Sequence, residues 1–525
     1  MKRALLFIPV IILLLIEINN PFLGPYGNNN STYSLQAKNY IRFGYLKTNF
    51  APLTNPGSTF PNDPKYYINH PPLLQILLSI SYRIFGLDNY WAGRFVPVIF
   101  TIISIFILSM IIEKLWGKLA SYISILLSTV IPMVFIYGKL IQFEPITLTF
   151  VLLSVLLLID YLKTENKIIF IILLFTIVLG FLADWPMIYF SFLLAIIFIW
   201  EKGVTKVKKE VITLVALPII LSMLYFIYAF LLLKHEILIQ AYLNRSINGP
   251  PFNLQYPFLS MSEVFLLRML IYFTPLGFIS GIILTVKTLK EKFELKHKII
   301  VLFIIFPVLY VLLFPNGAWE HPYWLFYFIP IIIFSATDIL IICYNSKLIK
   351  YILIFIIFIN SIFSFSIFFF KHEQTNKALW QENFINNIKP YIAKDKTIPI
   401  NWDFNDDFLR FKSDKQVVIL WDKKKLLNFL IKNPYEWDHF VFSCWANCST
   451  NDLELENKIL EKFDYSYKDY KNRAYLLNLN KIKKISIDKF ENKTKTTQEK
   501  IITPNESFMI KIYRNIRNGL FLEQI

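Results

Sequence analysis

Glu144 has the strongest case for chemistry in this chain, because it is a carboxylic acid at the start of a long apolar segment. A carboxylate at the border of a membrane is costly unless it is paired, hydrated or used. Partly desolvated there, it could act as the base that removes a proton from a hydroxyl or an amine. The structural alternative is an acid favoured by the positive end of a helix dipole, with Pro145 in the first turn.

His70 and Asp184 lie at similar borders. His70 is followed by two prolines, which would fix the approach to a helix and start it from the aqueous side. Asp184 precedes Trp185 and Pro186 in a short turn between two apolar segments. It could take part in a site, or it could cap a helix beside an interfacial tryptophan.

A third group of candidates combines basic side chains with aromatic ones. The stretch Trp319–Trp324 contains an acid, His321 and three aromatic residues. An aromatic belt at the membrane surface explains the rings but not the adjacent acid and histidine. Arg94 opens another apolar segment and could be either a snorkelling anchor or a partner for a phosphate group. Lys139, five residues before Glu144, is a further cation of this kind.

The composition identifies the elements that must position these residues as membrane spans. The chain of 525 residues is 55% hydrophobic and only 17% charged, so its apolar runs would be exposed patches on a soluble protein. We predict an all-α polytopic membrane domain of about eleven spans, within a range of 11–13. The runs are 4–18, 91–113, 118–137, 142–161, 167–183, 186–200, 211–233, 264–286, 299–314, 323–343 and 350–370. The net charge of +17 comes mainly from lysines in loops and in the tail, so it indicates topology and no nucleic-acid partner.

The segment 71–86 decides which residues share a compartment. It is short for a span and is interrupted by polar residues, so we expect a helix that lies in the membrane interface within a first outer loop of residues 19–90. Lysine-rich loops such as 202–209 and 287–298 then lie on the cytoplasmic side with the N-terminus, as the positive-inside rule requires. If the segment crossed the membrane, every later loop would invert. The candidate residues are therefore predicted to face the extracytoplasmic side.

The last 155 residues, 371–525, are predicted to form a separate extracytoplasmic α/β domain after a membrane domain of residues 1–370. Strand-like and helix-like stretches alternate there, which is typical of this fold class. They are 397–402, 416–421, 423–432, 439–445, 452–463 and 474–479. Cys444 and Cys448 are close enough in sequence to pair if the segment is exported.

Taken together, these features resemble the polytopic GT-C glycosyltransferases of family 39, which include protein O-mannosyltransferases and lipid A aminoarabinose transferases. The shared features are a long first outer loop, a His-Pro-Pro-Leu stretch at 70–73, Arg94 at the start of a span, an acid two spans later and a Trp-Pro turn. The resemblance covers about residues 1–345 and is most specific over 26–190. It implies an integral membrane enzyme that takes a sugar from a polyprenyl-phosphate carrier and transfers it to a lipid, glycan or protein acceptor outside the cytoplasm.

The resemblance also implies catalytic roles. The family's acidic motif in the first loop falls on residues 29–33, where this chain has Asn29 and Asn30 in place of carboxylates, followed by Tyr33. We predict that the two asparagines orient the acceptor and that Tyr33 contacts the substrate. The family's second acid matches Glu144, the predicted base.

The remaining roles concern the donor. His70 matches a basic residue that contacts the carrier phosphate, and Arg94 and Lys139 are predicted to neutralise the same leaving group. Asp184 and the stretch His321–Tyr323 are predicted to bind substrate.

A divalent metal is a candidate cofactor, with Glu144, His70 and His321 as its ligands, although one acid with scattered histidines is a weak ligand set. Three alternatives remain for the function. A polysaccharide polymerase or ligase would be distinguished by a late loop rich in Arg and His, and a lipid or solute transporter by polar residues near the middle of the membrane. The third is a family member that has lost its activity, as Asn29 suggests.

Overall fold

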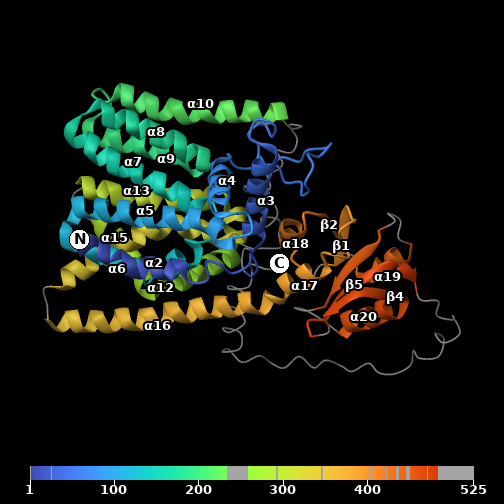
Figure 1. Cartoon of the computed structure of the whole chain (residues 1–525). Helices are drawn as coiled ribbons and strands as arrows, with labels where there is room; N and C mark the ends of the chain where they lie inside the picture. The colour runs from blue at the N-terminus through green and yellow to red at the C-terminus, as the bar shows by residue number, and fades with distance from the viewer. Residues whose placement is uncertain are drawn as a thin grey trace.

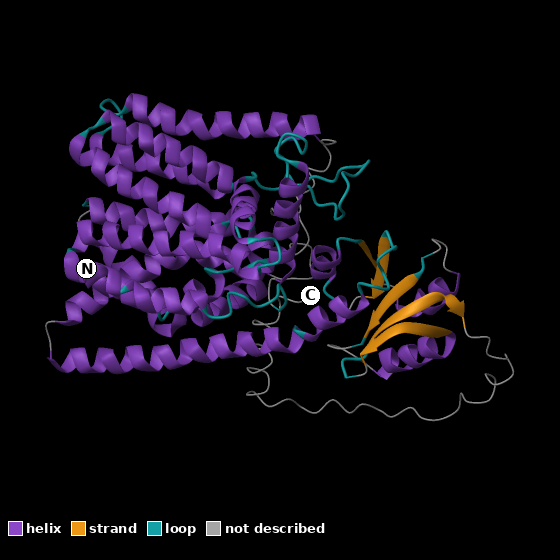
Figure 2. Ribbon diagram, in the orientation of Figure 1, coloured by secondary structure: helices purple, strands orange, loops and turns teal. Residues whose placement is uncertain are grey.

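The structure, a computed structural model, describes residues 2–24, 27–232, 258–290, 294–344, 347–401, 404–420, 423–432, 437–444, 450–469 and 471–482. It consists of a large helical bundle and a smaller α/β domain beside one end of that bundle (Figures 1 and 2). This architecture confirms the predicted fold class of a helical membrane domain followed by an α/β domain.

The bundle is built mostly from apolar helices. In chain order they are α1 (Lys2–Leu5), α2 (Phe7–Leu15), α5 (Tyr90–Trp116), α6 (Lys118–Ser128), η1 (Met133–Tyr137), α7 (Glu144–Thr164), α8 (Lys167–Ala183), α9 (Pro186–Lys202), α10 (Lys208–Leu232), α12 (Phe258–Lys290), α13 (Leu295–Leu313), α14 (Pro315–Glu320), η2 (Pro322–Phe328), α15 (Ile329–Tyr344) and α16 (Lys347–Ala378).

Within the described residues, six helical segments are long and apolar enough to cross a membrane. They are Tyr90–Trp116, Glu144–Thr164, Lys208–Leu232, Ser262–Thr288, Leu295–Leu313 and Pro322–Ile342. At 27 residues the first is about 40 Å long, which exceeds the roughly 30 Å of the hydrocarbon core. Shorter apolar helices add to these six, so the count of about eleven spans stays a prediction.

Two predicted runs have boundaries that differ in the structure. The run 118–137 is broken after Ser128, because Pro132 lacks the N–H that a continuous helix needs, and it resumes as the short η1. The last run does not stop at residue 370, since α16 continues through polar turns to Ala378. The predicted domain boundary therefore falls inside a helix.

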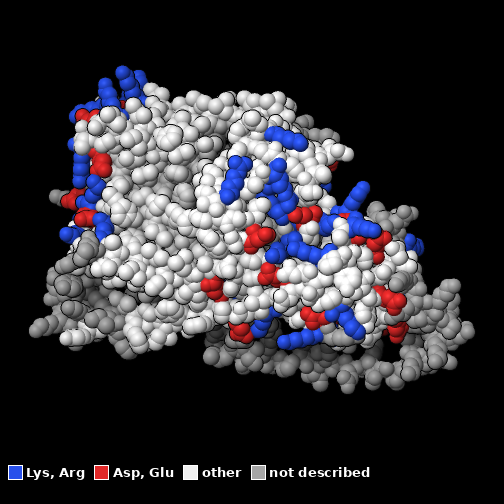
Figure 3. Space-filling view, in the orientation of Figure 1, with Lys and Arg blue, Asp and Glu red and all other residues white. Residues whose placement is uncertain are grey.

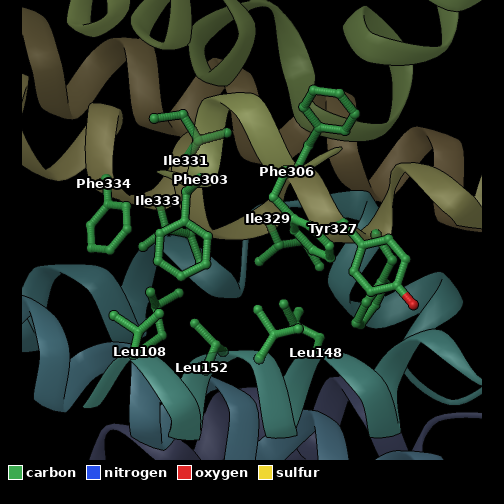
Figure 4. Packing of buried hydrophobic residues seen from close by; sticks show 14 of the residues in the cluster. Leu108, Leu148, Leu152, Phe303, Phe306, Tyr327, Ile329, Ile331, Ile333 and Phe334 are labelled. Atoms are coloured by element: carbon green, nitrogen blue, oxygen red, sulfur yellow. The ribbon is translucent and has the colours of Figure 1, made fainter. Parts of the chain in front are cut away.

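The bundle is held together by one large cluster of buried apolar side chains. Figure 4 shows part of it, in which Leu148 and Leu152 of α7 face Phe303 of α13 and Ile333 of α15. These residues lie on different spans, so the packing fixes the helices against one another. The open ends of the bundle are the places where polar side chains can gather.

Two helices of the first loop lie across one end of the bundle, α3 (Gly27–Phe43) and α4 (Leu73–Phe85) (Figure 1). Helix α4 covers most of the predicted segment 71–86 and ends at Gly86, whose positive φ of 93° suits glycine. It buries Leu74 and Leu78 but exposes Ile80 and Ile84, as a helix at a membrane surface would. The sequence analysis did not predict α3.

The C-terminal domain has one five-stranded sheet with helices on both faces. The elements are α17 (Trp380–Ile388), β1 (Thr397–Asn401), α18 (Asp406–Ser413), β2 (Gln416–Leu420), α19 (Lys423–Lys432), β3 (His439–Ser443), α20 (Thr450–Lys462), β4 (Phe463–Asp469) and β5 (Ala474–Ile482). The strand order is β2-β1-β3-β5-β4; β1 pairs in parallel with β2 and β3, and β5 pairs antiparallel with β3 and β4. The predicted strand and helix stretches correspond to six of these nine elements, while α17, α18 and β4 were missed.

The two faces of this sheet belong to different cores. Phe440 and Phe442 pack with α19 and α20, away from the bundle. The other face, with Val441 of β3, packs with α17 and α18 in a cluster that also contains residues of α3, α4 and α5. The domain is therefore docked on the first loop through a shared apolar core.

Asp414 adds an electrostatic contact to this docking. It follows α18 and accepts hydrogen bonds from Lys38 at 2.9 Å and from Arg42 at 2.6 Å, both on α3. Burial alone would raise the pKa of the Asp414 carboxyl group, but the two cations outweigh burial and hold that pKa below its usual value. The C-terminal domain is thus clamped to the helix that leads to the candidate site.

Charged side chains gather at the two ends of the bundle. Figure 3 shows a broad band between the ends that is nearly free of Lys, Arg, Asp and Glu on this face. A membrane that covers this band would separate the lysine-bearing turns, such as 202–209, from α3, α4 and the C-terminal domain.

We expect cysteines placed at the two ends of the bundle to react from opposite sides of the membrane. Asn62→Cys in the first loop and Thr205→Cys in the turn before α10 are both exposed positions. In intact cells an impermeant maleimide should label the Asn62→Cys variant and should reach Thr205→Cys only after permeabilisation. The wild-type chain, with its three cysteines, gives the background. Labelling of both variants from the same side would contradict the arrangement.

Removal of the Asp414 charge should loosen the C-terminal domain. Asp414→Asn leaves two partly buried cations without their carboxylate, which costs about 1–2 kcal/mol of docking. Because the pKa of Asp414 is lowered, its contribution is present at neutral pH and should be lost as the pH falls below about 4. Faster protease cleavage before β1 would report the loss. Glu454→Gln, which removes an exposed pair with Lys458 in the same domain, is the control and should leave cleavage unchanged.

Candidate active site

A cavity of about 160 Å³ lies where the first loop meets the bundle. Its walls come from α3, the approach to α4, the approach to α7 and the stretch after α14. The lining residues are Asn29, Thr32, Tyr33, Tyr67, His70, Gln142, Phe143, Glu144, His321, Tyr323 and Trp324. Six residues predicted for the site, from four separate parts of the sequence, therefore line a single cavity.

Glu144 and Gln142 form the buried polar part of the cavity. Glu144 is 2% exposed, and its Oε2 atom has no hydrogen-bond partner among the described residues. Gln142 is 1% exposed, and both polar atoms of its side chain are likewise unpartnered within the described chain. A buried polar group without a partner costs roughly 1–3 kcal/mol, so these groups are arranged for a ligand that supplies the missing bonds. Sequence reasoning found Glu144 and overlooked Gln142.

His70 is fixed on two sides. Its ring is stacked on Phe143, with centroids 4.3 Å apart, and on Tyr67 at 5.9 Å. Its Nδ1 atom lies 2.7 Å from Oδ1 of Asp184. Asp184 does not line the cavity and lies behind the histidine. Its position therefore differs from the direct substrate contact that the sequence predicted.

The opposite wall is aromatic and polar. Asn29 donates a hydrogen bond to the Tyr323 hydroxyl at 3.1 Å, and the ring of Tyr323 is stacked on His321 with centroids 5.0 Å apart. Close packing of Trp324 depends on Gly317, since a Cβ atom there would lie 2.0 Å from the indole ring. The helix start of α3 and the stretch after α14 are thus tied together across the cavity.

Besides Asp184, three residues predicted for the site do not line the cavity: Asn30, Arg94 and Lys139. Asn30 is buried and accepts a hydrogen bond from the backbone N–H of Ile141 at 2.8 Å, so it holds the turn before α7. Arg94 is 5% exposed, and its guanidinium group donates to the backbone oxygens of residues 18, 20 and 21. It ties the segment after α2 to α5 and does not line the cavity.

Lys139 belongs to a separate small cavity of about 60 Å³ beside Glu17 and Lys371. Its ammonium group donates to the backbone oxygen of Ile16 at 2.6 Å. Burial, together with the positive charge of Arg94, lowers the pKa of Lys139 to about 7. The structure places this cation away from Glu144 and His70, in contrast to the predicted phosphate contact.

A larger apolar cavity of about 440 Å³ lies on the other side of α14, between α12 and α13. Arg268 of α12 is the charged residue among its lining residues and is 2% exposed. Its Nη1 atom donates to the backbone oxygens of Ala318 and Trp319, whereas Nε and Nη2 have no partner among the described residues. Sequence reasoning missed Arg268, although a lone arginine inside an apolar run is itself a sign of function.

The side chains proposed as metal ligands do not form a ligand set. Glu144, His70 and His321 all line the cavity. No group of three His, Cys, Asp or Glu residues that could hold a metal ion occurs within the described parts of the chain. One side of His70 is occupied by Asp184, so the donors fit a metal poorly and no step below uses one.

Comparisons with known proteins bear on this fold and site. A family model described as dolichyl-phosphate-mannose-protein mannosyltransferase matches residues 69–228, which contain His70, Glu144 and Asp184. The search of curated proteins found no match.

Solved structures with the same fold include ArnT from Cupriavidus metallidurans bound to undecaprenyl phosphate, at 10% identity and a TM-score of 0.59 over 91% of this chain and 97% of that one. The archaeal oligosaccharyltransferase AglB from Archaeoglobus fulgidus, in complex with an inhibitory peptide and a dolichol-phosphate, is similar at 11% identity and a TM-score of 0.51, over 91% of this chain and 74% of that one.

These findings define the class of the protein as a polytopic membrane protein with a buried polar cavity at one end. Its fold is shared with the membrane glycosyltransferases ArnT and AglB, and residues 69–228 match the mannosyltransferase family model. The resemblance drawn from the sequence is confirmed at this level.

Proposed function

We propose that this chain transfers a sugar from a polyprenyl-phosphate donor to an acceptor on the extracytoplasmic side of the membrane. The proposal rests mainly on one observation: an apolar cavity with the incompletely paired Arg268 lies next to a polar cavity with the incompletely paired Glu144. The parts of a lipid-linked phosphosugar match these features in order: an apolar chain, an anionic phosphate and a polar sugar ring.

Arg268 is placed to meet the phosphate group. Its donors without a partner among the described residues lie beside a cavity lined largely by aliphatic and aromatic side chains. Such a cavity would bury an isoprenoid chain favourably. A desolvated guanidinium group binds phosphate strongly because it can donate two parallel hydrogen bonds. The segment 318–324 contributes lining residues to both cavities, so a phosphate between Arg268 and His70 would place its sugar beside Glu144.

Glu144 is then the base. In the reaction, the acceptor oxygen or nitrogen attacks the anomeric carbon, the bond from that carbon to the phosphate oxygen breaks, and polyprenyl phosphate leaves with the electron pair. Glu144 takes the proton of the acceptor. Cationic and hydrogen-bonding groups around the phosphate stabilise the leaving group.

The extracytoplasmic orientation has separate support. Cys444, at the end of β3, is disulfide-bonded, and structural disulfides persist mainly outside the cytoplasm. The lysine-bearing turns lie at the end of the bundle away from the cavity, as the positive-inside rule requires. ArnT and AglB, the similar structures, are described with undecaprenyl phosphate and dolichol-phosphate, which supports a donor of this kind.

Loss of the Glu144 carboxylate should abolish most of the transfer. The full-length chain in nanodiscs would receive radiolabelled polyprenyl-phosphate mannose and detergent-washed membranes as the source of acceptors. We expect Glu144→Gln to lower release of label from the lipid fraction by about 10²-fold or more, with thermal stability preserved because Gln has nearly the same shape. An active Glu144→Gln enzyme would contradict its role. A wild-type chain inactive on every lipid-linked sugar tried would favour the alternative of a family member with lost activity.

Arg268→Gln should act on donor binding instead. Removal of the phosphate contact is expected to raise the donor KM by about tenfold or more, with a smaller effect on kcat. Asp338→Asn is a matched control, since Asp338 is a buried acid that pairs with Lys287 at 2.7 Å outside both cavities. An Arg268→Gln variant with an unchanged donor KM would place the phosphate elsewhere.

A further inference from the structure

The pair of His70 and Asp184 is unusual because it is buried at the base of the cavity and joins distant parts of the chain. The His70 side chain is 9% exposed and that of Asp184 is 1% exposed. The Nδ1–Oδ1 distance of 2.7 Å is that of a charge-assisted hydrogen bond. A contact this short between buried groups is costly to form unless the two groups stabilise each other.

The surroundings fix both partners. Oδ1 of Asp184 also accepts the backbone N–H of Trp185 at 2.8 Å, so the carboxylate cannot turn away. The indole N–H of Trp185 donates to the backbone oxygen of Asn69 at 2.6 Å. The Tyr225 hydroxyl lies 2.9 Å from the backbone oxygen of His70 and 3.0 Å from that of Ile68. The turn between α8 and α9 and the helix α10 therefore both hold the segment that precedes α4.

The stacked rings alone do not decide between two orientations of the imidazole. Phe143 and Tyr67 lie nearly parallel to it, with interplanar angles of 16° and 17°, and this sandwich fixes the plane of the ring but not which edge faces the cavity. A half-turn about the Cβ–Cγ bond would return the ring to the same plane with Nδ1 and Cδ2 exchanged. The bond from Nδ1 to Asp184 distinguishes the two orientations, because a carbon in the place of Nδ1 could not make it.

We propose that Asp184 is a positioning residue for the donor, which holds the His70 ring with its Nε2 edge toward the cavity and stabilises the positive charge that the ring presents to the donor phosphate. This inference rests on the proposed function, because it assigns a role in binding the same lipid-linked donor. Asp184 acts through His70 and touches no substrate itself, since it lies outside the cavity lining.

The charges around the pair predict whether Asp184 strengthens or weakens phosphate binding. Glu144 is close enough to Asp184 for their charges to interact, so this region already contains two buried acids. With His70 in place, Asp184 favours phosphate binding because it supports the cation. Without His70, the same carboxylate would be a lone anion near a bound phosphate, and it would oppose binding.

A double-mutant cycle on binding of a fluorescent polyprenyl phosphate tests this reversal. The full-length protein in nanodiscs would be measured as wild type, Asp184→Asn, His70→Gln and the double variant. Asn at 184 keeps an oxygen that accepts from the ring and loses only the charge. We expect Asp184→Asn to weaken binding by about fivefold and His70→Gln by about tenfold, and the double variant to bind as well as His70→Gln or better.

Two further variants separate positioning from a merely structural role. His70→Lys restores a cation that needs no carboxylate to hold it, so it should bind the probe better than His70→Gln. Asp338→Asn removes a buried, paired acid outside the cavity and should leave binding within about twofold of wild type. Thermal unfolding of every variant shows whether the fold survives.

The outcomes distinguish the two proposals. If Asp184→Asn leaves affinity unchanged, or if its loss adds fully to that of His70→Gln, Asp184 does not act through His70 and the inference is overturned while donor binding stands. If the wild-type chain does not bind polyprenyl phosphate at all, the proposed function fails together with the inference.

Discussion

The cost of burying polar groups is the constraint that shapes this end of the molecule. A charged side chain removed from water needs a partner, and in most places the structure provides one. Arg94 donates to three backbone oxygens, and His70 is paired with Asp184. Several buried atoms nevertheless have no partner among the described residues, and those of Gln142, Glu144 and Arg268 belong to residues that line a cavity. The two cavities share the segment 318–324, so the same rule that explains the fold also supports the proposed place of the donor.

The first loop connects the candidate site to the C-terminal domain. Helix α3 gives Asn29 and Tyr33 to the cavity on one side and Lys38 and Arg42 to Asp414 on the other. The apolar core beneath the C-terminal sheet continues into α3, α4 and α5. A wall of the candidate site is therefore supported by a domain more than 350 residues away in the sequence. Positions on short helices such as α3 need this support, because a polar helix has little intrinsic reason to remain fixed across the end of a bundle.

How far the sequence predicts this structure depends on the range of the forces involved. Hydropathy and the alternation of strand-like and helix-like stretches identify the spans and most of the C-terminal domain, since these patterns are local. Helix α3 was missed because its 17 residues are mostly polar and show no apolar stripe, and it is buried only by neighbours distant in sequence. Arg94 and Lys139 were assigned to the phosphate on their position at a membrane border. Their actual partners are backbone oxygens, which leave no trace in the side-chain pattern. Gln142 and Arg268 were visible as polar residues in apolar runs, and more weight on that signal would have found them.

The cost of burying charge also bears on the asparagines at positions 29 and 30. The cavity region already contains the buried acids Glu144 and Asp184, and an anionic donor would bring further negative charge. Another carboxylate at 29 would add to the repulsion between these negative charges. The amide of Asn29 instead donates a hydrogen bond to Tyr323, and Asn30 accepts one from the turn before Glu144. Both keep the geometry of the first loop without adding negative charge, which suits the proposed binding of an anionic donor between His70 and Arg268.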